Sequence, residues 1–407
     1  MKKRAETKGK QLKIDFGALP ADSRSYITTA YRAKRSQTIK WKGMLAVPPG
    51  SLLESIIEDF QANTNIALEI PFMTFMHYIS GILVSRQTRI VFDGQDMDPE
   101  IWTIILAGSG AGKTWTEKHI RKGLAGTVPI IDSGAASAAK WLEELEQKPR
   151  GLWIRDEFYQ LLKNIESPGP LADLKDYLLR VYDNTDLTRT TKKGSINVEH
   201  PVLSILGFTP LDPFINGMQL ESLVDGFAQR FGFVLSRPDP NRKMIDYPFW
   251  KVNWQSWKPR FDEMVRDLQP KYTTGTDGEV TFARMFRSLA GINVEESFYR
   301  RVMWRAHKYA MIYHILRGSA ADPVLSKEDY GWAARLIELQ LADTADLVAL
   351  CSKTDIGKAV DAAETLVKRL REQGKPVTAR AIVSGTRTIN SVGMARMVLT
   401  ILNIQEG

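Results

Sequence analysis

The sequence predicts a mixed α/β fold, in which a mostly parallel sheet carries helices on both faces. Three observations lead to this prediction. An apolar, β-branched run at 101–106 is followed by a glycine-rich loop and a helix-forming segment. A second strand-like run, at 151–156, ends in an acidic residue, and another acidic residue follows it directly. Strand-like and helix-like segments then alternate to about residue 236, which is the pattern of a parallel sheet with crossover helices.

Composition narrows the class of protein. Of 407 residues, 43% are hydrophobic and 25% are charged, as in soluble globular proteins. The single cysteine, Cys351, excludes an intrachain disulfide. No apolar run approaches the roughly 20 residues of a membrane span, and the basic N-terminus lacks the apolar core of a signal peptide. We therefore expect no membrane contact and a cytoplasmic location. The net charge of +8 favours a polyanionic partner.

Changes in composition along the chain divide it into six segments. They are a basic, partly disordered arm at 1–44, a helical lead-in at 45–94, a core at 95–236, an aromatic and basic insertion at 237–280, a helical bundle at 281–375, and a helix-turn-helix-like end at 376–407.

The lead-in predicts two helices. Ser51 can cap a helix that runs to about residue 63, and its apolar residues share one face. The segment 72–86 is apolar nearly all round, which predicts a buried helix. A short strand at 89–92 and an Asp-Gly turn then lead into the strand at 101–106.

The core and the C-terminal region continue the series. Strands are expected at 128–132, 151–156, 202–207 and 231–235, with helices at 137–147, 157–165 and 171–182 between them. Further helices are expected at 298–316, from the capping-box pattern at 326–329 towards 351, and at 358–373. Two short helices between 378 and 402 resemble a helix-turn-helix, and a wing could follow.

The loop AGSGAGKT at 107–114 has the strand–loop–helix context of a phosphate-binding loop. Backbone N–H groups in such a turn point at phosphate oxygens from a helix N-terminus. Lys113 would reach the β- and γ-phosphates of ATP, and the Thr114 hydroxyl would hold Mg²⁺. A glycine-rich turn without a ligand is the alternative. The expected phosphate-binding residues are Gly108, Ser109, Gly110, Ala111, Gly112, Lys113 and Thr114.

The acidic pair that ends the strand at 151–156 supplies the other groups that an ATPase needs. In open α/β sheets, ligands bind at the carboxyl ends of the strands. Asp156 would hold the Mg²⁺ shell, and Glu157 would polarise the attacking water. The alternative is a surface acidic pair at a helix N-terminus, where the helix dipole favours negative charge.

A basic hairpin is predicted at 188–198, because β-forming residues flank a Lys-Lys-Gly-Ser turn. Lys192 and Lys193 at its tip could grip DNA phosphates and release counterions. An ordinary solvated hairpin is the alternative.

Two further residues could complete the site. Thr209 ends the strand at 202–207 and could sense the γ-phosphate, or merely cap the next segment. Arg230 could act as an arginine finger on a neighbouring subunit. It could equally form a structural salt bridge, and Arg237 and Arg242 are rival fingers.

Two other groups of residues carry weaker signals. The aromatic residues between 247 and 257 lie near lysines and could stack single-stranded bases, although such residues more often fill a core or an interface. The five histidines and the single cysteine show no zinc-ligand spacing.

The motifs together resemble a family of uncharacterised phage and prophage P-loop proteins, which often accompany primase domains. The resemblance covers about 45–350. It rests on AGSGAGKT (107–114), DSGAAS (132–137), IRDEFYQLL (154–162), the stretch 178–210, DGFAQRF (225–231) and WRAHKYAMIYHIL (304–316). It implies a RecA/AAA+-like P-loop NTPase three-layer core, with a helical lead-in and a helical C-terminal region ending in a winged-helix-like unit.

The same resemblance implies an ATP- and Mg²⁺-dependent DNA translocase or helicase of phage or mobile-element replication in the bacterial cytosol. Such enzymes are homo-oligomers, here expected as a hexameric ring on single-stranded DNA with ATP at the subunit interfaces. Two alternatives stay open. One is an ATP-switched, DNA-binding loader or initiator without unwinding activity, and the other is a defence or signalling NTPase.

Overall fold

The computed structural model describes residues 47–132, 134, 136–191, 194–217, 226–237, 245–289, 296–402 and 404. The chain divides into two compact units between Leu347 and Val348, within a long helix. The larger unit lies within residues 36–347 and holds every candidate site residue. The smaller unit is C-terminal. The arm predicted at 1–44 lies outside the described residues.

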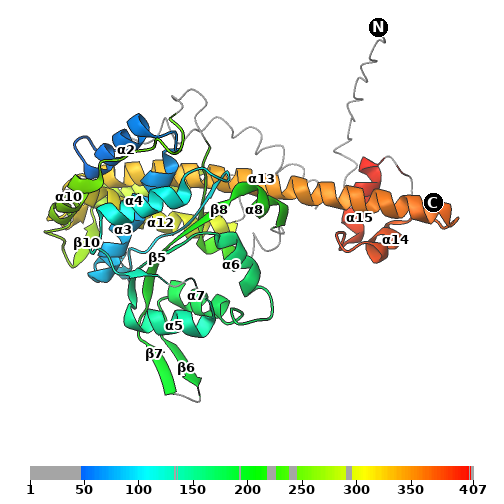
Figure 1. The fold of residues 1–407 in the computed structure, drawn as a ribbon, viewed down its shortest axis with the longest axis horizontal. Coiled ribbons are helices and arrows are strands. Elements are labelled where there is room, and N and C mark those ends of the chain that lie inside the picture. The colour runs from blue at the N-terminus through cyan, green and yellow to red at the C-terminus, as the bar shows by residue number, and fades with distance from the viewer. Residues whose placement is uncertain are drawn as a thin grey trace, which may run out of the picture. The chain divides into compact units, whose positions relative to one another are not determined.

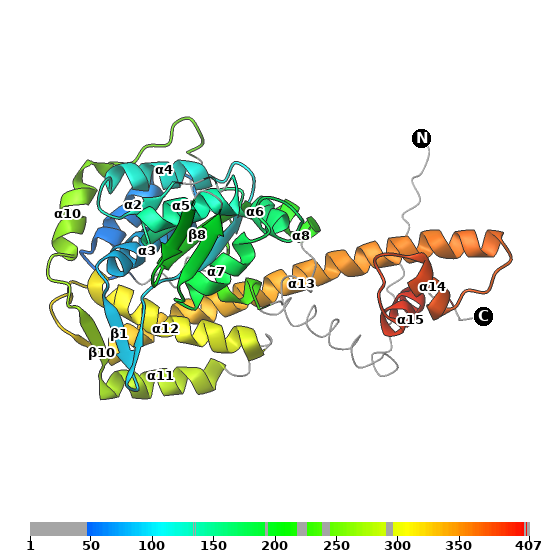
Figure 2. The same ribbon diagram turned by 90° about the horizontal axis from the view of Figure 1, so that it is seen from below.

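The larger unit is built on a five-stranded sheet whose paired strands are all parallel (Figure 1 and Figure 2). Its strand order is β4 (Ile130–Ile131), β5 (Arg150–Arg155), β8 (Val202–Pro210), β3 (Trp102–Ala107) and β9 (Gly232–Leu235). Strands β3 and β9 are buried throughout, as expected of a parallel sheet covered on both faces. The mixed α/β class that the sequence predicted is confirmed.

Helices cover both faces of this sheet, which agrees with a three-layer arrangement (Figure 1). On one face lie α3 (Glu69–Ser85) and α4 (Lys113–Gly123). The Ser80 hydroxyl of α3 shares a hydrogen bond with the Ser204 hydroxyl of β8. On the other face lie α5 (Ala138–Gln147), α6 (Phe158–Ile165) and α7 (Leu174–Tyr182). There Trp141 packs against Trp153 of β5, with ring centroids 5.4 Å apart.

The helical lead-in forms as the sequence predicts. Helix α2 spans Leu52–Asn63, and the Ser51 side chain caps it by accepting a hydrogen bond from the Glu54 N–H at 3.1 Å. Helix α3 is buried on all sides except at its last residue, so it has no amphipathic stripe. Its uniform apolarity reflects a position between the sheet and the other helices.

A second, four-stranded sheet joins distant parts of the chain. Its order is β11 (Val324–Leu325), β10 (Lys271–Thr274), β1 (Arg89–Phe92) and β2 (Gln95–Met97). The aromatic and basic segment expected at 237–280 supplies β10 and helix α10 (Trp257–Met264). Trp257 and Phe261 of α10 are buried, so these aromatic residues belong to the core.

The helices that follow are α11 (Thr276–Leu289), α12 (Glu296–Leu316) and α13 (Lys327–Glu372). Two separate helices, one towards residue 351 and one at 358–373, were predicted where α13 runs without a break, and that prediction is wrong. The stretch SKTDIG at 352–357 resembles a linker. A glycine inside a helix costs only about 1 kcal/mol relative to alanine, however, and does not by itself end it.

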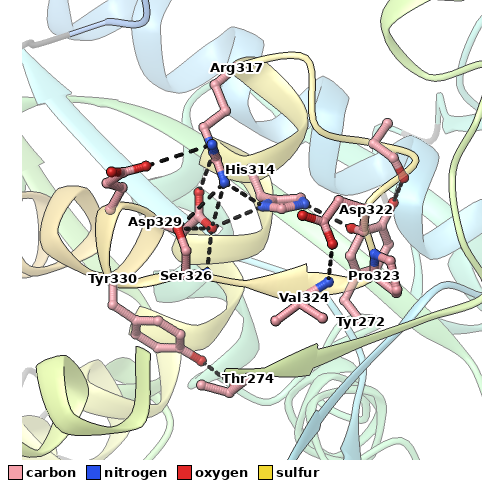
Figure 3. Close-up of polar contacts among 12 residues, drawn as sticks. Tyr272, Thr274, His314, Arg317, Asp322, Pro323, Val324, Ser326, Asp329 and Tyr330 are labelled. Carbon is pink, nitrogen blue, oxygen red and sulfur yellow. Dashed lines mark hydrogen bonds and ion pairs between the residues drawn. The ribbon is translucent and has the colours of Figure 1, made fainter. Parts of the chain in front are cut away.

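A buried polar cluster fixes the start of α13 against α12 (Figure 3). The Asp329 carboxylate accepts hydrogen bonds from His314 Nδ1 at 2.9 Å, from Arg317 Nε at 2.8 Å and from the Ser326 N–H at 2.7 Å. Burial by itself raises the pKa of Asp329. The hydrogen bonds from His314, Ser326 and Arg317 outweigh burial and hold it below its ordinary value. The capping-box pattern at 326–329 is thus part of a larger hydrogen-bond network.

The smaller unit contains the end of α13, α14 (Ala379–Gly385) and α15 (Val392–Ile401). Its core includes Ala363, Ile382 and Val398. The Thr378 side chain caps α14 by accepting from the Ala381 N–H at 3.1 Å. The two helices predicted between 378 and 402 are therefore confirmed, whereas the segment expected to hold a wing lies almost entirely outside the described residues.

We predict that Asp329→Asn lowers the unfolding free energy of the larger unit by about 3 kcal/mol, because it removes the buried, charged acceptor of the hydrogen bonds from His314, Arg317 and the Ser326 N–H. Glu328→Gln is the control, since Glu328 is exposed and lies 3.8 Å from Arg317. It should cost less than about 1 kcal/mol. Urea unfolding at neutral pH measures both.

The pH dependence gives a further check on this cluster. A carboxylate with a depressed folded pKa stabilises the protein above its unfolded pKa, ordinarily 3.8, and loses that contribution as the pH falls further. The gap between wild type and Asp329→Asn should therefore narrow only in acid below about pH 4. Equal stability of the two proteins at neutral pH would contradict the assignment.

Candidate functional site

The loop between β3 and α4 has the backbone of an anion cradle. Gly110 and Gly112 have φ values of 75° and 81°, a left-handed region that side chains disfavour. A Cβ on Gly112 would lie 2.6 Å from carbons of the Ile66 side chain, so only glycine fits there. Helix α4 begins at Lys113, and the first N–H groups of a helix have no partner inside it. The loop and helix together present donors to an anion.

Lys113 lies across this loop. Its Nζ donates to the carbonyl oxygens of Gly108 at 2.8 Å and Ala107 at 3.3 Å, and the residue is buried. Burial lowers the pKa of Lys113, while the nearby carboxylates of Asp156 and Glu157 act in the opposite direction. The oxygens of a phosphate are charged and would be stronger acceptors for this ammonium group than the two carbonyl oxygens.

The acidic pair lies opposite the loop. Asp156 and Glu157 directly follow β5, and the Thr114 hydroxyl donates to Asp156 Oδ2 at 2.5 Å. The Glu157 N–H donates to Asp156 Oδ1 at 2.9 Å. Glu157 precedes α6 with a left-handed φ of 52°, which is unusual for a non-glycine residue. Backbone strain of this kind is common at functional sites.

Sheet order explains why these groups face one another. Strand β8 lies between β3 and β5, and neighbouring strands are about 4.8 Å apart, so the ends of β3 and β5 are separated by about 10 Å. All three strands are parallel, so their carboxyl ends share one edge. The gap above β8 therefore has a basic loop on one side and two carboxylates on the other.

A pocket of about 440 Å³ occupies this gap. Its lining combines residues of the glycine-rich loop with the acidic pair and with residues from two other segments. The lining residues are Ser109, Gly110, Ala111, Gly112, Lys113, Thr114, Trp115, Asp156, Glu157, Pro210, Tyr247 and Trp250. The structure therefore brings together most of the residues that the sequence singled out for nucleotide and metal binding.

The pair of Thr114 and Asp156 fits a magnesium ion. Among the described residues, no group of three or more His, Cys, Asp and Glu side chains could hold a metal. Mg²⁺ does not need such a group, because it keeps several waters and usually takes one or two protein oxygens plus substrate phosphates. A hydroxyl and a carboxylate 2.5 Å apart at the loop offer those hard oxygen ligands.

Thr209 lies near this pocket but does not line it. Its side chain is fully buried, and its hydroxyl has no hydrogen-bond partner in the part of the chain described. The next residue of β8, Pro210, is the one that reaches the pocket. The sensor role predicted for Thr209 would require this strand end to move, and it stays a prediction.

Arg230 lies at the opposite edge of the sheet, because it precedes β9 whereas the loop follows the parallel strand β3. Its guanidinium donates to the Gly226 carbonyl at 2.6 Å, lies 3.4 Å from the Asp183 carboxylate and stacks on Tyr182 at 5.0 Å. Within one subunit it forms the salt bridge that was its alternative explanation. A role towards a neighbouring subunit stays a prediction.

The rival arginines differ in position. Arg237 follows β9 and so lies at the edge of the sheet that carries the glycine-rich loop, where it is 55% exposed and 3.7 Å from Asp346. Arg242 lies outside the described residues. Arg237 and the glycine-rich loop therefore lie at the same edge of the sheet, whereas Arg230 lies at the opposite edge.

The basic hairpin has its predicted strands. Strand β6 (Leu187–Thr191) pairs antiparallel with β7 (Gly194–Val198), and Thr191 faces Gly194 across the turn. The hairpin projects beyond α5 and α7 and leads into β8 (Figure 1). Lys192 and Lys193, which make its tip, lie outside the described residues.

Sequence reasoning did not assign Tyr247 and Trp250 to this pocket. It placed them in an aromatic segment with a core, interface or nucleic-acid role. A local signal did exist, since Trp115 directly follows the loop and offers an apolar surface for other aromatic residues to pack on. Only the folded chain shows which of the aromatic residues use it.

Two comparisons bear on the family of this chain. No protein-family model matches the chain, and no curated protein matches it. The resemblance to phage P-loop proteins therefore stays a prediction. In the described part of the chain, no helix has both the length and the apolarity to cross a membrane.

We predict that Gly112→Ala destabilises the protein and weakens its binding of tripolyphosphate. The left-handed backbone costs an alanine about 1–2 kcal/mol, and the new Cβ displaces Ile66. Gly108→Ala is the stability control, because a Cβ there meets nothing within 4 Å. Urea unfolding and calorimetric titration measure the two effects. If both variants unfolded like the wild type, Gly112 would not be the constrained position.

Proposed function

We propose that the chain is a RecA/AAA+-like P-loop ATPase that hydrolyses ATP in the pocket between the phosphate loop and the acidic pair. The observation that carries the proposal is the 2.5 Å hydrogen bond between Thr114 and Asp156, made at the mouth of a glycine-rich loop. A structural glycine turn would not need a buried lysine and two carboxylates directed at the same space.

Different residues would bind the phosphates, hold the metal ion and accept the proton during hydrolysis. The N–H groups of 108–114 and the Lys113 ammonium group hold the β- and γ-phosphate oxygens. Thr114 and Asp156 would hold Mg²⁺, which when bound neutralises charge on those oxygens. Glu157 orients a water molecule and accepts its proton as the water oxygen bonds to the γ-phosphorus. The bond from the γ-phosphorus to the β–γ bridging oxygen breaks, its electron pair stays on ADP, and inorganic phosphate is the other product.

We predict that Glu157→Gln retains ATP binding but lowers turnover by about 100-fold or more, because the amide cannot accept the proton from water. Glu166→Gln, at an exposed position after the same helix α6, should leave turnover unchanged. Steady-state phosphate release and ATP titration separate the two properties. A normal rate in Glu157→Gln would show that another group is the base.

We further propose that the ATPase is a DNA translocase or helicase, working as an oligomeric ring in phage or mobile-element replication. A projecting hairpin with a Lys-Lys tip and a net charge of +8 support a DNA partner. Arg230 lies at the end of the sheet away from its own loop, so an arginine-finger role for it would have to be at a neighbour's site and would require it to leave Asp183. ATP would then lie at subunit interfaces, and a hexamer is the expected assembly.

We predict that Lys192→Ala combined with Lys193→Ala weakens single-stranded DNA binding and lowers the salt slope by about 1.4, which is 0.7 for each lost phosphate contact. Lys258→Ala with Lys271→Ala removes the same charge at exposed positions elsewhere. Fluorescence anisotropy at several salt concentrations measures the slope. Unchanged, equally salt-sensitive binding in the hairpin variant would remove the hairpin from the DNA site.

A second candidate function is an ATP-switched loader or initiator that binds duplex DNA without unwinding it. The smaller unit favours this candidate. Residues 373–405 contain Lys375, Arg380, Arg387 and Arg396 and no acidic residue, and the three arginines are exposed around the short helices α14 and α15. Strand displacement on a forked substrate separates the candidates, because only a helicase performs it. Hydrolysis without any DNA binding would instead favour the defence or signalling class.

A further inference from the structure

The candidate ATP pocket has an aromatic wall that phosphate chemistry does not use. Trp115 follows Thr114 on α4, while Tyr247 and Trp250 belong to a segment much later in the chain. Phosphates are held by backbone N–H groups, a lysine and hydroxyls, and they gain nothing from aromatic rings. The wall therefore suits another part of the ligand.

Trp250 is the fixed member of this wall. Its indole N–H lies 2.8 Å from Asn65 Oδ1 and 2.7 Å from the Ile245 carbonyl oxygen. Its ring packs edge-to-face on Trp115, with centroids 5.5 Å apart. A Cβ on Gly112 would lie 3.3 Å from its Cη2. Trp250 is thus held directly beside the loop that would carry the phosphates.

Tyr247 is the open member. Its ring meets the Trp250 ring edge-to-face, at 5.7 Å and 72°, yet the residue is 67% exposed. A tyrosine packed at one edge and exposed over most of its surface offers a free aromatic face. Phe249, two residues away, is 72% exposed but does not line the pocket.

We propose that Tyr247 stacks on the base of the bound nucleotide, and that Trp250 holds Tyr247 in position. The inference rests on the proposed ATPase function and adds a base-binding residue to it. A triphosphate seated in the loop leaves the ribose and base directed out of it, and the aromatic wall lines the same pocket. Every base has a π-face, so stacking alone selects nucleoside triphosphates over bare polyphosphate without distinguishing adenine from guanine.

The test compares MgATP with magnesium tripolyphosphate, which has the phosphates but no base, by calorimetric titration of the full chain. Tyr247→Ala should weaken ATP binding by about 5- to 150-fold, the range for loss of one aromatic stack, and change tripolyphosphate binding by less than about twofold. Tyr247→Phe keeps the ring and should bind ATP like the wild type. Tyr247→Leu keeps apolar bulk without a π-face and should resemble Tyr247→Ala. Phe249→Ala is the matched control and should leave the affinities for ATP and for tripolyphosphate unchanged.

The outcomes separate this inference from the function it rests on. If the wild type binds ATP and Tyr247→Ala binds it equally well, or loses ATP and tripolyphosphate in parallel, stacking by Tyr247 is overturned and the ATPase proposal survives. If the folded wild type binds neither ligand, both are overturned. Equal unfolding midpoints of all variants ensure that the comparison is between folded proteins.

Discussion

The hydrogen bond from the Thr114 hydroxyl to the Asp156 carboxylate joins residues 42 positions apart, and the candidate site depends on it. It forms because β3 and β5 run parallel with β8 between them, so that both strands end at one edge. Any change of strand order or direction would place the glycine loop and the acidic pair apart. The same constraint creates the gap of about two strand spacings in which a phosphate and a water could meet.

Two segments outside the five-stranded sheet pack beside the glycine-rich loop at this edge. One precedes α3, and the other is the aromatic segment after β9. Helix α3 forms part of the layer under the sheet, and the connection before it carries Asn65 and Ile66 to the loop. The aromatic segment returns Trp250 to the same place and then adds β10 to the second sheet. Neither segment is an accessory to the core, since both contact the loop that would bind phosphate.

The site residues that the sequence predicted do not all lie in the pocket. The loop, its lysine and the acidic pair were found from residue type and order, and the structure brings them together. Thr209 and Arg230 were also picked by position along the chain. The structure buries the first and pairs the second with Asp183 at the far edge of the sheet. Sequence distance from a strand does not show which face of the strand, or which of its ends, a side chain occupies.

Sequence alone sufficed for features set by neighbours along the chain. The Ser51 cap, the glycines that allow left-handed turns and the alternation of strands with helices depend on short-range sterics and hydrogen bonds. Tertiary structure alone decided that Trp250 meets Asn65 across 185 residues, and that Tyr247 lines the pocket beside the glycine-rich loop while Phe249 does not. Such contacts follow from how layers pack, and local preference carries no information about a partner so distant in the chain.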